Sequence, residues 1–372
     1  ITCDSDGFVT GIDLRDNNLV GQFPVYTRNN YTDRWGDPVH ESEWEYFKYG
    51  LANLYSLKKL DLADNTLTGT IEYLPLYELP SLTHFDVSGN QLSGDVDALI
   101  TPSLTYADFS NNLFTSMRRF EKLKQSFQSL RFCDVSNNTI QNKATDLLEN
   151  IPPNIDQFFA SNSEIYGSLP KSLNDLPKLR KFDMSSNALF GSLPGFTESF
   201  ATLQELDVSG QKNGFNFTGS IPDNIWRSLS LKVLNLADNR LTGSIPTLVG
   251  NLAVLEVFDL TNNIVKGSIP SELGMLEGSL KHLRLSNNMF TGTIPSQLGQ
   301  LEGATVLLKL KENNFYDSSK TAPLSLCTLR SVIEFDLAND TQLCPVERNA
   351  LSDFYDSTKG AEWTDSTNWL DE

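Results

Sequence analysis

Apolar and polar positions repeat along most of this chain, at intervals that are mostly 24 or 25 residues. One repeat reads LKKLDLADNTLTGTI from Leu57 to Ile71. Because side chains of a strand alternate between its two faces, Leu60 and Leu62 are expected to point inward and Asp61 outward. The pattern therefore predicts one short strand per repeat, with the repeats stacked so that their leucines form one continuous core.

An asparagine follows the second strand leucine by three residues in most repeats, where its amide is expected to bond to the backbone of neighbouring turns. These asparagines are Asn17, Asn65, Asn90, Asn112, Asn138, Asn187, Asn239, Asn263, Asn288 and Asn313. Ser163, Gln211 and Asp340 stand at the same position in three further repeats, and each can still form hydrogen bonds. The count predicts about 13 turns.

The consensus L-x-x-L-x-L-x-x-N-x-L-x-G-x-I-P resembles the leucine-rich repeat. Its ending, as in LTGSIP (241–246), VKGSIP (265–270) and FTGTIP (290–295), is similar to the plant-type extracellular subclass found in plants, algae and oomycetes. The resemblance implies an α/β solenoid with short parallel strands on a concave face and loops or short helices on a convex face. It also implies a secreted or cell-surface recognition or scaffold protein.

The two ends resemble the two halves of the cap that opens such domains. Residues 1–8 look like the second half, residues 9–343 the solenoid with an insertion at 25–53, and residues 344–372 the start of a following cap. This arrangement favours one unit of a tandem or head-to-tail array. The alternative is that residues 346–372 cap this same solenoid or begin an unrelated cap.

Charge and motifs exclude several function classes. With 29 basic and 47 acidic residues the net charge is -18, which argues against nucleic acid or an anionic membrane as partner. No apolar run reaches the length of a membrane span. Nucleophile elbows, phosphate loops and zinc spacings are missing from the sequence, so we predict no enzymatic activity and no cofactor.

Cysteines and glycosylation sequons fit a secreted protein. By the resemblance, Cys327 and Cys344 flank the last turn and are expected to form a disulfide, while Cys133 occupies a buried strand position. Cys3 is left without a predicted partner. Predicted N-glycosylation sites are Asn30, Asn137, Asn216 and Asn339.

An acidic stripe is predicted along the inner strands. Its members are Asp13, Asp61, Asp86, Asp108, Asp134, Asp183, Asp207 and Asp259. The aspartates also belong to the subclass consensus, so a structural role is one interpretation and calcium binding is the weaker alternative. Arg284 and Lys309 replace the acid toward the C-terminal end, and the resulting polarity could orient head-to-tail contacts.

Two groups of aromatic residues are candidates for partner binding. Within the insertion, Tyr26, Tyr31 and Trp35 are expected to be exposed, although a helix that buries Trp44 and Phe47 is an equal alternative for that segment. Tyr106, Phe132 and Phe159 stand at neighbouring positions of the concave face, where they would form a small apolar patch.

The sequence thus predicts a non-enzymatic extracellular glycoprotein with a structural or adhesive role, joined to copies of itself end to end in a filament. The alternative is a discrete ectodomain of the receptor or inhibitor kind that binds a peptide, glycan or protein on its concave face.

Overall fold

A computed structural model describes residues 1–23, 53–71, 76, 79–96, 101–117, 128–196, 201–301, 307–315 and 335–336. Its contacts divide the chain into two compact units. Unit 1 contains Ile1–Phe190 and Lys212–Phe215, and unit 2 contains Gly191–Gln211 and Asn216–Glu372. The two units are described separately below.

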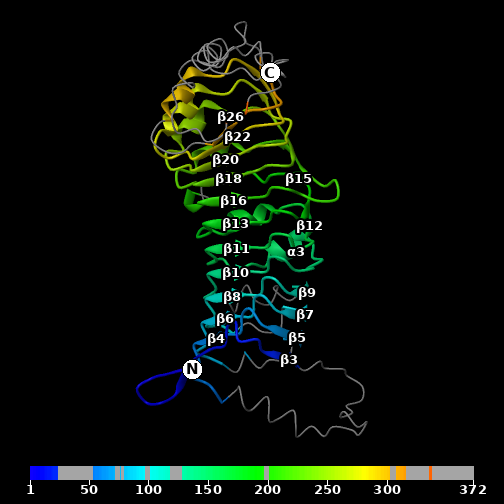
Figure 1. Ribbon diagram of the computed structural model, residues 1–372, viewed down its shortest axis with the longest axis vertical. Helices are drawn as coiled ribbons and strands as arrows, with labels where there is room; N and C mark the ends of the chain where they lie inside the picture. The colour runs from blue at the N-terminus through cyan, green and yellow to red at the C-terminus, as the bar shows by residue number, and fades with distance from the viewer. Residues whose placement is uncertain are drawn as a thin grey trace, which may run out of the picture. The chain divides into compact units, whose positions relative to one another are not determined.

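In unit 1 each repeat contributes one strand to a long sheet, and the strands follow one another in chain order (Figure 1). The order is β1-β2-β4-β6-β8-β10-β11-β13, in which only β1 pairs antiparallel. The bounds are β1 Thr2–Cys3, β2 Val9–Asp13, β4 Lys59–Asp61, β6 His84–Asp86, β8 Tyr106–Asp108, β10 Phe132–Asp134, β11 Gln157–Phe159 and β13 Lys181–Asp183. Asp13 of β2 lies directly opposite Asp61 of β4, so these two strands are neighbours in the sheet.

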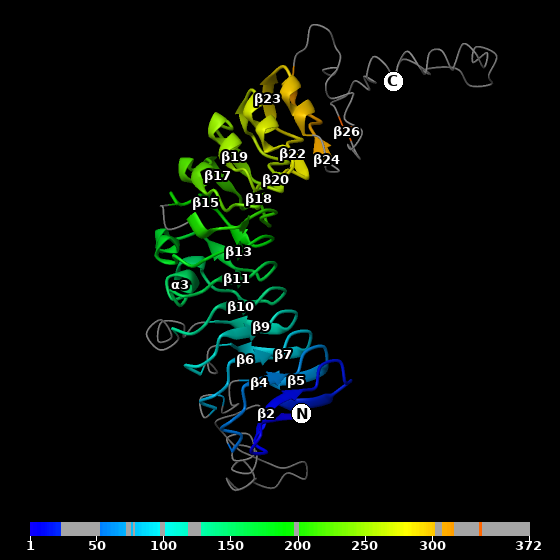
Figure 2. The same ribbon diagram turned by 90° about the vertical axis from the view of Figure 1, so that its left-hand side faces the viewer.

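Most turns of unit 1 add a second strand after the strand of the long sheet, and these second strands form smaller sheets (Figure 2). A four-stranded sheet contains β3 Val20–Phe23, β5 Thr66–Thr70, β7 Gln91–Asp95 and β9 Leu113–Ser116, and a two-stranded sheet contains β12 Tyr166–Gly167 and β14 Ala188–Leu189. The described helices are α3 Ala144–Leu148 and the 3-10 helix η2 Lys171–Asp175.

Unit 2 repeats this plan. Its long sheet has the order β16-β18-β20-β22-β24-β26, and all its pairs are parallel. These strands are β16 Glu205–Asp207, β18 Val233–Asn235, β20 Val257–Asp259, β22 His282–Arg284, β24 Leu307–Lys309 and β26 Phe335–Asp336. The smaller sheets contain β15 Gly191–Ser192, β17 Phe217–Ser220 and β19 Arg240–Thr242, and β21 Lys266–Gly267, β23 Met289–Gly292 and β25 Asn314–Phe315. Its described 3-10 helices are η4 Asp223–Arg227, η5 Thr247–Asn251, η6 Ser271–Leu276 and η7 Ser296–Gln300.

Prolines and glycines of the repeat set the local turns. Each of these 3-10 helices starts directly after a proline, such as Pro246 before η5, because the ring fixes a backbone angle suited to the first turn. Gly243 has a φ of 84°, and a Cβ atom there would lie 3.1 Å from Cβ of Ser220. Glycine is required at this point both for the left-handed backbone and for the close approach of the preceding turn.

The core lies between the long sheet and the outer turns, where the repeat leucines and several phenylalanines are buried. Asn138 illustrates the asparagine ladder inside it. Its Nδ2 donates to the carbonyls of Phe109, Val135 and Ser136, and its Oδ1 accepts from the Phe114 N–H. Seven parallel strands in unit 1 and six in unit 2 match the predicted 13 turns, so the solenoid prediction is confirmed.

Candidate functional site

The predicted acidic stripe forms one row across each long sheet. In unit 1 the register aligns Asp13, Asp61, Asp86, Asp108, Asp134, Phe159 and Asp183. Most of these carboxylates accept a hydrogen bond from the backbone N–H two residues later, as Asp108 does from Ser110 at 3.0 Å. This local bond holds the chain as it leaves the strand, and it gives the aspartates a structural role.

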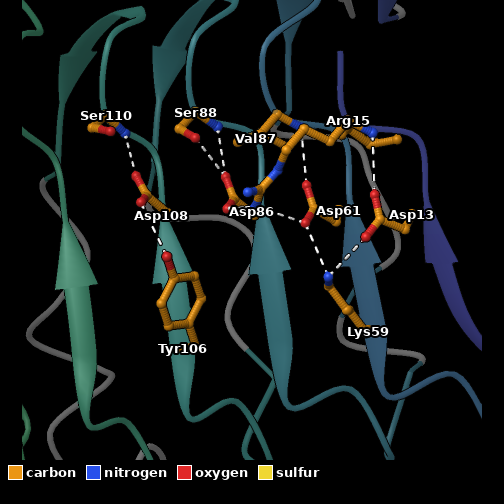
Figure 3. Close-up of polar contacts among 12 residues, drawn as sticks. Asp13, Arg15, Lys59, Asp61, Asp86, Val87, Ser88, Tyr106, Asp108 and Ser110 are labelled. Atoms are coloured by element: carbon orange, nitrogen blue, oxygen red, sulfur yellow. Dashed lines mark hydrogen bonds and ion pairs between the residues drawn. The ribbon is translucent and has the colours of Figure 1, made fainter. Parts of the chain in front are cut away.

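Two basic side chains neutralise the N-terminal part of the row (Figure 3). Arg15 Nη2 lies 2.8 Å from Asp61 Oδ2 and 3.1 Å from Asp86 Oδ2, so it bridges two strands. Lys59 Nζ lies 3.0 Å from Asp13 Oδ2 and 3.1 Å from Asp61 Oδ2. Its hydrogen bond to Asp13 raises the pKa of Lys59 and lowers the pKa of the Asp13 carboxyl.

These contacts bury carboxylates that the sequence analysis predicted to lie on an exposed face of the sheet. The side chain of Asp61 has no exposed surface and that of Asp86 is 3% exposed, whereas 56% of Asp13 is exposed. Arg15 stands where most repeats have serine, two residues after the aspartate, and its longer side chain reaches over both acids. A long basic residue in place of the usual serine is the sequence signal that predicts an ion pair at Arg15.

A possible set of metal ligands lies on β4 and β6, next to Arg15 and Lys59. Asp61, His84 and Asp86 can each offer one ligand atom within 4.8 Å of the others. However, Arg15 and Lys59 already form ion pairs with these carboxylates, and a divalent cation would have to displace them. We therefore assign the cluster to ion pairing, and calcium binding along the row stays a hypothesis from the sequence.

An aromatic row in unit 1 runs beside the acidic row at Tyr106 and Phe132 and enters it at Phe159, which lies opposite Asp134. Tyr106 stacks on Phe132 with ring centroids 4.3 Å apart and an interplanar angle of 6°, and Phe132 meets Phe159 at 5.7 Å. His84 extends the row, because its ring stacks on Tyr106 at 4.2 Å and 10°. All four side chains are partly exposed. The structure thus brings together the three aromatics chosen from the sequence and adds His84.

The sequence prediction did not include His84, because the predicted patch was apolar and the imidazole ring is polar. It occupies the same place in its repeat as Tyr106 and Phe132, with which the sheet register aligns it. Burial lowers the pKa of His84, which favours the neutral ring and therefore stacking. Aromatic rings at the first strand position of neighbouring repeats, as at His84, Tyr106 and Phe132, are the sequence signal for this row.

The aspartates next to the aromatic row, Asp108 and Asp134, differ in their partners from Asp61 and Asp86, which pair with Arg15. Asp108 accepts hydrogen bonds from the Ser110 N–H and from the Tyr106 hydroxyl, the latter at 3.3 Å (Figure 3). Among the described residues, neither Asp108 nor Asp134 has a lysine or arginine within ion-pair distance. Burial raises the pKa of Asp108, and it raises the pKa of Asp134 to about 6.

Replacing Asp134 by asparagine is expected to stabilise the protein at pH 7 by about 2 kcal/mol. The folded-state pKa of Asp134 lies above the ordinary value of 3.8, so protonation favours the folded state, and this contribution is lost as the pH rises through about 6. Asparagine removes the buried charge and keeps an oxygen that can accept the Ser136 N–H bond. Urea unfolding at pH 4 and pH 7 measures the effect, which should be largely absent at pH 4.

The exposed Asp146→Asn on α3 is the control, and it should change stability little at either pH. An Asp134→Asn effect of equal size at both pH values would mean that the buried charge is not its cause.

In unit 2 the corresponding row contains Asp207, Asn235, Asp259, Arg284, Lys309 and Asp336. Arg284 Nη1 lies 3.2 Å from Asp259 Oδ2, and Asn235 donates to Asp207 Oδ2 at 2.7 Å. The change from acidic to basic residues predicted at Arg284 and Lys309 is therefore present on adjacent strands. Its proposed role in head-to-tail contacts stays a prediction.

Several sequence predictions fall outside the described residues. These are Tyr26, Tyr31, Trp35, Cys327, Cys344, Asn30, Asn339 and the cap-like segment 344–372. Asn137 is exposed with a φ of 54°, Asn216 is partly exposed, Cys133 is buried and Cys3 is exposed with a free thiol. In the part of the chain that the structure covers, every helix is too short or too polar to cross a bilayer.

Comparisons with known proteins match this architecture. The Leucine Rich Repeat family model matches residues 230–252 and 279–301. Among solved structures, a TDR receptor superposes with a TM-score of 0.69 over 92% of this chain and 58% of that chain, at 24% identity. This chain has the leucine-rich-repeat fold. A leucine-rich-repeat protein of Leptospira interrogans shares the fold at a TM-score of 0.56 and 21% identity, over 81% of this chain and 83% of that one.

More specific likenesses come from longer proteins. The leucine-rich-repeat ectodomain of the Arabidopsis thaliana receptor kinase GASSHO1/SCHENGEN3, solved in complex with CASPARIAN STRIP INTEGRITY FACTOR 2, is 26% identical, with a TM-score of 0.52 over 77% of this chain and 39% of that chain. Receptor-like protein 47 of Arabidopsis thaliana is 31% identical over 129 residues, and the leucine-rich repeat-containing protein slrA of Dictyostelium discoideum is 31% identical over 143 residues. These alignments cover 31% and 38% of this chain but span only 16% and 10% of those two relatives.

Proposed function

We propose that this leucine-rich-repeat chain is a non-enzymatic extracellular recognition module that binds a peptide or protein segment on the exposed face of the long sheet in unit 1. The aromatic row of His84, Tyr106, Phe132 and Phe159 is the observation that carries the proposal. Partly exposed rings on a rigid sheet offer a large contact area at little cost in conformational entropy. The L-x-G-x-I-P repeats and the likeness to receptor ectodomains support assignment to the plant-type extracellular subclass.

The chemistry of this face favours a partner segment with a basic side chain. Asp108 and Asp134 lie beside the rings and have no basic neighbour among the described residues. An arginine or lysine of the partner could pair with these carboxylates and lie over the face of Tyr106 or Phe132, which adds a cation–π attraction. The net charge of -18 would speed the approach of such a segment.

A peptide selection tests the proposal. Random twelve-residue peptides displayed on phage are selected on the immobilised protein, and the affinity of the enriched peptides is measured by fluorescence anisotropy. We expect arginine or lysine next to an apolar residue in the enriched peptides. Phe132→Ala should raise their Kd by about tenfold or more, because truncating a central aromatic contact commonly costs more than about 1.4 kcal/mol.

Val257→Ala is the matched control, because Val257 occupies the same repeat position on β20 of unit 2 as Phe132 on β10 of unit 1. Thermal unfolding of both variants checks that each remains folded. Selected peptides that bind wild type and Phe132→Ala equally well would place the recognition surface elsewhere.

A second proposal is an end-to-end array with a structural or adhesive role, based on the resemblance of residues 347–372 to the start of a cap. The mass of the natural protein under reducing, deglycosylated conditions tests it. A mass several times the 41.5 kDa of this sequence supports a covalent tandem array, and a mass near 41.5 kDa contradicts that form. A head-to-tail array of separate chains is tested by light scattering of the native protein, where a monomer mass contradicts it.

A further inference from the structure

A polar groove of about 740 Å³ lies in unit 1, where the chain leaves the strands β8, β10, β11 and β13. It is separate from the aromatic row, with which it shares no residue. Seven of its lining residues carry amide side chains, among them Asn137, Gln141 and Asn162, and the others include Glu164, Tyr166 and Lys212. Amide side chains predominate among them, which is an unusual composition for a hydrophobic docking surface.

Hydrogen bonds hold the exposed amides of the groove in place. Asn162 Nδ2 donates to Asn137 Oδ1 at 2.8 Å, and Asn137 Nδ2 donates to Asn111 Oδ1 at 3.0 Å. Asn137 and Asn162 have φ values of 54° and 52°, a left-handed conformation that asparagine tolerates better than most residues. Each amide keeps a further hydrogen or lone pair for a ligand, and its orientation is fixed before the ligand arrives.

The short insertion after Gln211 supplies one wall of this groove. The contacts of Lys212–Phe215 assign them to unit 1, although the residues on either side belong to unit 2. The Lys212 N–H donates to the Asn187 carbonyl at 2.6 Å, and Lys212 Nζ donates to Asn162 Oδ1. The Phe215 ring stacks on Phe190 with centroids 5.6 Å apart. The insertion is thus bonded to the groove rather than extended into solvent.

The lining also contains an exposed aromatic ring and a polar pair. Tyr166 of β12, which lies beside α3 in Figure 1, is 47% exposed. Gln141 Nε2 donates to Glu164 Oε2 at 3.0 Å. Glu164 and Lys212 carry opposite charges, so the lining as a whole favours neither an anion nor a cation.

We infer that this groove binds a pyranose saccharide, with Tyr166 against the apolar C–H face of one ring and the amides of Asn137, Asn162 and Gln141 bonded to its hydroxyls. Hydroxyl groups both donate and accept hydrogen bonds, as amides do, and the exposed ring of Tyr166 suits the apolar C–H face of an uncharged sugar ring. A peptide would need apolar pockets for alternate side chains, and the lining contains few apolar side chains.

Two sources could supply such a saccharide. One is a free oligosaccharide, and the other is a glycan linked to Asn137, which lines the groove and begins the sequon Asn137-Asn138-Thr139. In the second case Asn137 Nδ2 carries the glycan, so Tyr166, Asn162 and Gln141 make the contacts with the sugar. The experiment therefore needs one arm for each source.

The first arm uses the full chain made without glycosylation in bacteria. Cellohexaose, chitohexaose, laminarihexaose and mannohexaose are titrated separately, and binding is followed by calorimetry and by saturation-transfer NMR. We expect at least one hexasaccharide to bind, and Tyr166→Ala to weaken its binding by about tenfold or more, as expected for the loss of an aromatic anchor. Tyr55→Ala is the matched control, because Tyr55 is also an exposed tyrosine of unit 1, at 54% exposure.

The second arm uses the chain secreted from a glycosylating host. Mass spectrometry measures occupancy of Asn137, and endoglycosidase digestion compares release of its glycan with release of the glycan at Asn216. If the Asn137 glycan occupies the groove, it should be released more slowly than the Asn216 glycan, and Tyr166→Ala should remove this protection.

Tyr166-dependent binding in the first arm supports the inference with a free saccharide as ligand. Tyr166-dependent protection in the second arm supports it with the Asn137 glycan as ligand. If no hexasaccharide binds and the Asn137 glycan is absent or unprotected, the inference is wrong. Binding that Tyr166→Ala leaves unchanged contradicts it equally, and neither result bears on the aromatic row.

Discussion

Asn138→Ala is expected to lower the free energy of unfolding by about 2 to 3 kcal/mol, because the buried Phe114 N–H loses its acceptor, and a buried polar group left without a partner costs roughly 1 to 3 kcal/mol. The side chain of Asn138 serves three carbonyls and the Phe114 N–H from a position that is 5% exposed. Each of the three carbonyls keeps a second donor, which is Asn112 for Phe109, Ser163 for Val135 and the Asn111 N–H for Ser136. The Phe114 N–H is therefore the group that loses its acceptor. Urea unfolding followed by circular dichroism measures the change.

Two further variants separate the ladder from general effects of substitution. Asn138→Asp keeps an acceptor for the Phe114 N–H but turns a second oxygen toward three carbonyls, so we expect it to be at least as destabilising as alanine. Gln141→Ala changes an exposed residue of the same turn, and it should cost less than about 0.5 kcal/mol. An Asn138→Ala loss below about 1 kcal/mol would show that water replaces the amide without cost.

The asparagine ladder is also where sequence and structure agree best. The degenerate positions were expected to keep hydrogen bonding, and Ser163 and Gln211 do, whereas Asp340 lies outside the described residues. Ser163 Oγ donates to the Val135 carbonyl at 2.8 Å, and Gln211 Nε2 donates to the Val208 carbonyl at 3.0 Å. The prediction succeeded because strand period, inward leucine and ladder amide are all fixed within one repeat, where spacing in sequence determines spacing in space.

Contacts between repeats were harder to predict. The stacking of Tyr106 on Phe132 follows from equal repeat positions, since adjacent strands align in register. The burial of Asp61 and Asp86 does not follow, because it depends on how far Arg15 reaches across two strands. The return of the Lys212–Phe215 insertion to unit 1 depends on its own turn and on Phe190. A repeat consensus contains no information about such exceptions.

Arg15→Gln is expected to destabilise unit 1 by about 2 to 3 kcal/mol, because it leaves two buried carboxylates without their common partner. Asp86 then has no cation among the described residues, and Asp61 keeps only Lys59. The expected loss of stability is smaller than that typical of a fully buried ion pair, because 49% of the Arg15 side chain is exposed to solvent. Chemical unfolding at pH 7 and low salt measures the change.

A double-mutant cycle identifies the cause of that loss. If burial of an unpaired charge is responsible, Asp86→Asn in the Arg15→Gln background should recover part of the stability, although Asp86→Asn alone should not stabilise the wild type. Lys59→Gln should cost less than Arg15→Gln, because one of its two partners, Asp13, is 56% exposed. Equal losses for Arg15→Gln and Lys59→Gln, with no recovery by Asp86→Asn, would mean that Arg15 acts through packing alone. Recovery would establish that the N-terminal part of the acidic row is an internally neutralised structural element, and would leave Asp108 and Asp134 as the carboxylates available to a basic partner.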